Sequence, residues 1–188
     1  MKKILTDVDG VLLDWESTFH EWMSNKGYSK VVNGTYDLDI SYNLHKDNKH
    51  DLVREFNDSA WMCCLPVLRD ARSGVARLVD AGYEFDVITS LSIDPYAKVL
   101  RQQNLDLHFG KDPWAELVCL DTGADKDEAL AVYKDSRLWW IEDKPENCDA
   151  GLRAGLCPIL IDHLHNRWYD NPDVIRVYTW KELCEVIL

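Results

Sequence analysis

Two aspartates, Asp7 and Asp9, lie two positions apart at the end of a short apolar run and are followed by Gly10. Residues 4–8 predict a buried strand because they are apolar and partly β-branched. Glycine lets the backbone turn sharply, so both carboxylates are expected at the carboxyl end of that strand, where open α/β sheets bind ligands. Such a pair supplies a nucleophile or metal ligand together with a group that handles protons. The same residues also fit an ordinary Asp-Gly turn, and this stretch alone does not separate the two interpretations.

From residue 66 onward, predicted strands alternate with predicted helices. Besides the first strand at 4–8, strands are expected at residues 83–89, 116–120, 137–141, 157–161 and 174–178, and helices at 70–80, 94–103, 125–134, 145–154 and 181–188. Strands that alternate with helices of about ten residues predict an α/β fold, a doubly wound parallel sheet with right-handed crossovers.

Residues 14–65 depart from this pattern. Trp15, Phe19, Trp22 and Met23 recur at helical spacing, and a second short helix is expected at 51–56, but the polar stretch between them has no clear period. A length of 188 residues suits one domain with an insertion. We therefore predict a core formed by residues 1–13 and 66–188, with a small, mostly helical cap at 14–65 inserted after the first strand.

Polar groups follow several predicted strands. They are the hydroxyl pair Thr89 and Ser90, the cation Lys126 at a helix start, and the acidic pair Glu142 and Asp143. Each has an ordinary alternative: a helix cap, a solvated lysine, or favourable charge at a helix start. All of them fall at strand or helix ends, however, and the strands of a parallel sheet end at one edge. Clustered carboxylates suit Mg²⁺, and hydroxyls, lysine and metal together bind a phosphoryl group.

These residues form a pattern that resembles the haloacid-dehalogenase superfamily of phosphatases, with a Rossmann-like core. Its four motifs match residues 7–11, residues 88–90, Lys126 and residues 141–143. Within the superfamily, the chain looks most like the 5'(3')-deoxyribonucleotidase branch, which shares the Thr-Ser pair, the paired acids of the fourth motif and a modest helical cap.

The resemblance implies a set of roles. Asp7 would be the nucleophile, and Asp9 would protonate the leaving oxygen and then activate water. An acid at position 9 favours a phosphatase over a dehalogenase, whose leaving group needs no proton. The remaining roles are Mg²⁺ binding by Asp7, the Asp9 carbonyl and Asp143, and phosphate binding by Thr89, Ser90 and Lys126.

Three positions need comment. Glu142 replaces the first of the two usual aspartates, so Asp143 is the expected direct metal ligand. Asn147 stands where many superfamily members carry a further acid, and we expect it to support the site. Lys126 is preferred over Lys134 because it lies at a helix start.

The substrate prediction depends on the insertion. Trp15 either stacks on a nucleobase above the phosphate site or packs within the cap, whereas packing is expected for Trp22 and Trp61. The leading hypothesis is a phosphomonoesterase acting on a (deoxy)nucleoside monophosphate. A sugar phosphate or another small phosphoester is the alternative substrate, and a non-catalytic binding module is the alternative class.

The composition limits the classes of partner that the protein is expected to bind and indicates its location. A net charge of −12 disfavours nucleic acid and anionic membranes. Six cysteines without zinc-like spacing, and no apolar stretch long enough to span a bilayer, favour a cytoplasmic protein. His163 and His165 are expected in a surface loop, and these patterns leave the oligomeric state open.

Overall fold

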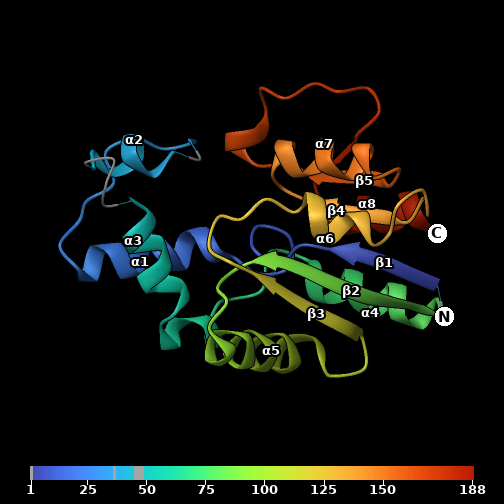
Figure 1. Ribbon diagram of the computed structural model, residues 1–188, viewed down its shortest axis with the longest axis horizontal. Coiled ribbons are helices and arrows are strands. Elements are labelled where there is room, and N and C mark those ends of the chain that lie inside the picture. The colour runs from blue at the N-terminus through green and yellow to red at the C-terminus, as the bar shows by residue number, and fades with distance from the viewer. Residues whose placement is uncertain (1, 36, 45–48) are drawn as a thin grey trace.

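The chain forms a parallel sheet with helices on both faces (Figure 1). The computed structural model describes residues 2–35, 37–44 and 49–188. The strands are β1 (Lys2–Thr6), β2 (Tyr83–Ser90), β3 (Trp114–Leu120), β4 (Trp139–Glu142), β5 (Cys157–Ile161) and β6 (Ile175–Val177), in the order β3-β2-β1-β4-β5-β6. Neighbouring strands are parallel throughout this sheet. The predicted doubly wound α/β class is confirmed.

Five helices follow the strands of the core. They are α4 (Ala71–Asp80), α5 (Pro95–Phe109), α6 (Asp127–Ala131), α7 (Pro145–Arg153) and α8 (Trp180–Ile187). Successive side chains of a strand point to opposite faces, so Ile4 packs in the larger hydrophobic cluster with α4 and α8, whereas Leu5 packs in a second cluster with α6 and α7. Both faces of the sheet are therefore covered.

Some boundaries differ from the predicted ones. β1 ends at Thr6 because the carbonyl of Val8 accepts hydrogen bonds from the following turn, at Val11, Leu12 and Leu13, and so leaves the ladder. The helix predicted to end at residue 103 continues to Phe109.

The segment between β1 and α4 is mostly helical. It contains α1 (Trp15–Asn25), α2 (Leu38–Tyr42), α3 (Lys49–Asn57) and the 3₁₀ turn η1 (Ala60–Cys63). Asp14 caps α1 by accepting a hydrogen bond from the Ser17 amide at 3.0 Å. Neither α2 nor η1 was predicted, because elements this short do not show a full helical period. Figure 1 shows α1 and α3 beyond the ends toward which the arrows of β1 and β2 point.

Within the described residues, none of the helices has the length and apolar character needed to cross a membrane.

Candidate active site

Three buried charged groups meet at the carboxyl end of the central strands. Asp7 directly follows β1, and its amide donates to the Ile141 carbonyl of β4 at 2.9 Å. Lys126, which caps α6, places Nζ 2.8 Å from Asp7 Oδ1 and 2.7 Å from Glu142 Oε1. The predicted lysine thus lies between the first and fourth motifs. Its rival Lys134 is exposed and lies beyond the end of α6.

The electrostatics of this cluster reflect its burial. Burial raises the pKa of Asp7 to about 7, the adjacent Lys126 opposes this shift, and Glu142 and Asp143 add to it. Burial alone would lower the pKa of Lys126, but the ion pairs with Asp7 and Glu142 raise it overall. The lysine therefore stays charged, and the carboxylates still outnumber it, so the site favours a further cation.

Three carboxylates form a candidate metal site with oxygen donors alone. Asp7, Glu142 and Asp143 each offer a carboxylate oxygen, and these atoms lie within 4.8 Å of one another. Hard oxygen donors of this kind suit Mg²⁺. Asp7 and Asp143, two of the three residues predicted to hold a metal, thus belong to this cluster, and its third carboxylate comes from Glu142 and not from Asp9.

Glu142 differs from the other two carboxylates because the protein already occupies both of its oxygens. Oε1 accepts from Lys126 and from Asn147 Nδ2 at 2.6 Å, and Oε2 accepts from the amides of Asp143 at 2.8 Å and Lys144 at 2.9 Å. Such a carboxylate orients its neighbours, which leaves Asp7 and Asp143 as the better placed ligands. Asn147 contacts Glu142, in keeping with the supporting position expected for it.

Gly10 joins the first motif to the fourth. Its φ is +74°, and a Cβ atom at this position would lie 2.3 Å from Asp143 Oδ2. No other residue fits, because the contact is far below van der Waals distance and the backbone is left-handed.

The expectation that His163 and His165 lie in a surface loop is wrong. Both are partly buried: His163 caps the 3₁₀ turn η2 (Leu164–Asn166), His165 lies within it, and the centroids of their stacked rings are 5.2 Å apart. His163 Nε2 donates to the Gly10 carbonyl at 2.7 Å, and His165 Nε2 lies 3.4 Å from Asp143 Oδ2.

Asn166, at the end of η2, donates to the Asp143 carbonyl at 2.8 Å. This segment follows β5, so the rule that carboxyl ends share one edge would have placed it at the site had it been applied to that strand.

Asp9 points to a different partner. Its carboxylate accepts from both terminal nitrogens of Arg101 on α5, at 2.7 and 3.0 Å. Burial raises the pKa of Asp9 to about 6, and Arg101 opposes that shift. Sequence reasoning missed Arg101. A usable signal was its spacing, which places it on the buried face of α5 beside Ala97 and Leu105.

The two hydroxyls of the second motif differ. Thr89 is buried, and no hydrogen-bond partner for its Oγ1 is found among residues 2–35, 37–44 and 49–188. Ser90 is partly exposed, and its Oγ donates to the Ala124 carbonyl at 2.8 Å. Within the described residues, the Thr89 hydroxyl can therefore hydrogen-bond to a ligand without giving up another contact.

Trp15 lies in the aromatic cluster of the insertion. Its Nε1 donates to Asn57 Oδ1 at 3.0 Å, and its ring stacks on Phe19 with centroids 4.5 Å apart. Trp22 is buried in the same cluster, and Trp61 packs partly buried against the main core. One face of the Trp15 ring is thus already covered by Phe19.

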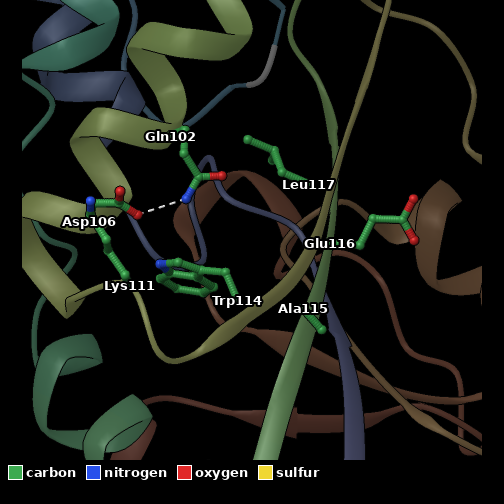
Figure 2. Close-up of a pocket in the computed structure, with 7 residues that line it drawn as sticks. All are labelled: Gln102, Asp106, Lys111, Trp114, Ala115, Glu116 and Leu117. Atoms are coloured by element: carbon green, nitrogen blue, oxygen red, sulfur yellow. Dashed lines mark hydrogen bonds between the residues drawn. The ribbon is translucent and has the colours of Figure 1, made fainter.

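A separate pocket lies between α5 and β3 at the edge of the sheet (Figure 2). It includes Trp114, Lys111 and Glu116, and the Gln102 amide donates to Asp106 across its rim at 2.7 Å. It contains none of the predicted site residues.

Comparison with known proteins places the fold. No family profile matches the chain. An uncharacterized 32.4 kDa protein of the Gp30-rIII intergenic region of Enterobacteria phage T4 is 24% identical over 189 residues, which cover 96% of this chain and 67% of that protein.

Several solved structures are similar over nearly their whole length. The haloacid dehalogenase-like hydrolase SP0104 from Streptococcus pneumoniae has a TM-score of 0.71 at 15% identity, covering 100% of this chain and 99% of its own. A predicted phosphatase from Clostridium acetobutylicum has a TM-score of 0.66 at 17% identity, with 99% and 97% covered.

D,D-heptose 1,7-bisphosphate phosphatase from B. bronchiseptica, solved with magnesium and phosphate, has a TM-score of 0.61 at 13% identity, with 100% and 98% covered. At these identities the likeness establishes architecture and not activity. The chain has the fold of the haloacid dehalogenase-like hydrolases.

Proposed function

We propose that this protein is a Mg²⁺-dependent phosphomonoesterase that hydrolyses a (deoxy)nucleoside monophosphate through an aspartyl-phosphate on Asp7. The observation that carries the proposal is the ion pair between Asp7 and Lys126 at 2.8 Å, within the carboxylate cluster that includes Asp143. A nucleophilic carboxylate beside a buried cation is the arrangement that in-line attack on a phosphoryl group requires.

In the first step an oxygen of Asp7 forms a bond to phosphorus while the bond to the ester oxygen breaks. Asp9 donates a proton to that leaving oxygen. Water then attacks the phosphorus of the aspartyl-phosphate and gives its proton to Asp9, which releases inorganic phosphate and restores Asp7. Every proton taken up in one half of the cycle is returned in the other.

Charge stabilisation supports both steps. Lys126 offsets negative charge on the phosphoryl oxygens, and the Thr89 and Ser90 hydroxyls are the proposed additional donors. Mg²⁺, held by Asp7, Asp143 and the Asp9 carbonyl, would supply Lewis-acid neutralisation of the same oxygens. Glu142 and Asn147 would orient Lys126 and the backbone of Asp143.

The insertion supports the choice of a nucleotide. Residues 14–65 are the proposed cap, and Trp15 follows the first motif closely, so the ring face not covered by Phe19 is the candidate platform for a base. A sugar phosphate is the second candidate, because a phosphatase of similar fold acts on a heptose bisphosphate. The six cysteines are free, which is typical of the reducing cytoplasm that we propose as the location.

The test is phosphate release from a panel of nucleoside 5'- and 3'-monophosphates and sugar phosphates, with Mg²⁺ or with chelator. Mg²⁺-dependent turnover that favours deoxynucleotides supports the proposal. Turnover that favours sugar phosphates keeps the mechanism but replaces the substrate. A folded protein that hydrolyses none of them would be a binding module.

A further inference from the structure

Arg101 is an arginine in the interior of the protein. It lies in the middle of α5 with a side chain that is 0% exposed, among Ala97, Leu100 and Leu105 on the buried face of that helix. Burying a guanidinium is costly unless a carboxylate compensates it. Its position therefore calls for a specific partner, and Asp9 is that partner.

The contact between the two residues is bidentate. Nη1 donates to Asp9 Oδ1 at 2.7 Å and Nη2 donates to Oδ2 at 3.0 Å, while the Asp9 side chain keeps 22% exposure. A planar fork on a carboxylate fixes both its position and the orientation of its plane, which a lysine ammonium does not do. Each carboxylate oxygen keeps a second lone pair for exchange with a substrate.

The bidentate contact between Arg101 and Asp9, which we call the clamp, also reaches the insertion. Nη2 of Arg101 lies 3.5 Å from Met62 Sδ, and Met62 belongs to η1, which packs directly on α5. The carboxylate of Asp9 is thus held by the core helix that follows the second motif, at the point where that helix meets the insertion.

We propose that Arg101 is a positioning residue that holds the Asp9 carboxyl group in the geometry from which it exchanges a proton with the leaving oxygen. The inference rests on the proposed function, because it assigns a task to Asp9 in that reaction. It predicts that losing the clamp slows hydrolysis most for the substrates whose leaving group most needs a proton.

Two substrates separate this role from a merely structural one. A nucleoside monophosphate releases an alkoxide that must be protonated, whereas para-nitrophenyl phosphate releases a stable phenolate. For Arg101→Met we expect kcat/KM, which reports phosphoryl transfer to Asp7 and not the later hydrolysis step common to both esters, to fall at least tenfold further on the nucleotide than on the aryl ester. KM should change little on either substrate.

Two further variants complete the comparison. Arg101→Lys retains the charge without the fork and should recover only part of kcat/KM on the nucleotide. If Arg101→Met does not fold, Arg101→Lys takes its place in the comparison of the two esters. Lys3→Met is the matched control, because Lys3 pairs with the buried carboxylate of Asp86 at 2.7 Å within the sheet. This control should change kcat/KM on both substrates by the same factor.

A double-mutant cycle tests the pair without turnover. If the clamp exists in solution, the unfolding equilibrium constants of Arg101→Met, Asp9→Asn and the double variant should be non-additive by at least tenfold. Additive effects would overturn the proposal.

The outcomes of the kinetic test are distinguishable. Equal losses of kcat/KM on both esters, in a protein whose wild type is active, would overturn the role of Arg101 and leave the proposed function intact. A wild type without turnover on either ester would overturn both.

Discussion

Replacing Gly10 by alanine should damage the site in a way that its contacts make measurable. The added Cβ would lie 2.3 Å from Oδ2 and 2.6 Å from Cγ of Asp143, where unstrained non-bonded atoms stay about 3.5 Å apart. Asp143 is buried, its backbone carbonyl accepts from Asn166, and His165 Nε2 lies 3.4 Å from its Oδ2, so the carboxylate has little room to withdraw. The substitution should therefore displace the proposed metal ligand.

The expected magnitude has three parts, two on the free energy of unfolding and one on activity. Left-handed backbone at φ +74° costs alanine about 1–2 kcal/mol relative to glycine. Overpacking against Asp143 adds about 1–3 kcal/mol. Displacing a group that stabilises transition-state charge costs roughly 2.7–4 kcal/mol, which corresponds to about 10²–10³ in kcat/KM.

Gly82→Ala is the matched control. Gly82 has φ +86°, and a Cβ there would meet nothing within 4 Å. Urea unfolding and Mg²⁺-dependent phosphate release should be measured on both variants. Gly82→Ala should lose only the backbone contribution and keep full activity. The reasoning fails if Gly10→Ala matches Gly82→Ala in both unfolding free energy and kcat/KM.

Three further predictions follow from individual contacts. Lys126→Met should abolish turnover and lower the free energy of unfolding by about 3–5 kcal/mol, measured in urea, because it leaves buried carboxylates without their cation; wild-type stability would contradict this. Asn166→Ala removes donors to the carbonyls of Asp143 and Ile161 and should cost about 1–3 kcal/mol per unpaired group, seen as a lower Tm, whereas an unchanged Tm would refute it. Trp15→Ala should reduce kcat/KM for nucleotides more than for para-nitrophenyl phosphate, and equal losses would count against base stacking.

Much of the site was predictable because it depends on where parallel strands end. Asp7 follows β1, Glu142 ends β4 and Asp143 follows it, and β1 and β4 are neighbours in the sheet, so strand order alone brings the three together. Lys126 was identifiable by its place at a helix start. These positions need only the alternation of strands and helices, which a hydrophobic pattern reports well.

The parts that were missed depend on tertiary contacts. Arg101 pairs with a residue 92 positions away, and a lone basic residue in a helix usually faces solvent. His163 contacts Gly10 because of where η2 lies in the fold. A turn this short has no hydrophobic period in the sequence that would predict its position. The partners of a buried charge and the paths of loops are set by packing. The sequence pattern could therefore place Arg101 on a buried helix face and η2 at the correct edge of the sheet, but it could not show which residues they contact.

The measurement that tests the central claim most directly is trapping of a phosphoryl group on Asp7. Wild-type protein and Asp7→Asn would be mixed with Mg²⁺ and a nucleoside monophosphate carrying radiolabelled phosphate, quenched in acid, and assayed for protein-bound label and phosphate release. We expect acid-stable, hydroxylamine-labile label and turnover in the wild type, and neither in a folded Asp7→Asn variant. Substantial turnover by Asp7→Asn would contradict the assignment of Asp7 as the nucleophile.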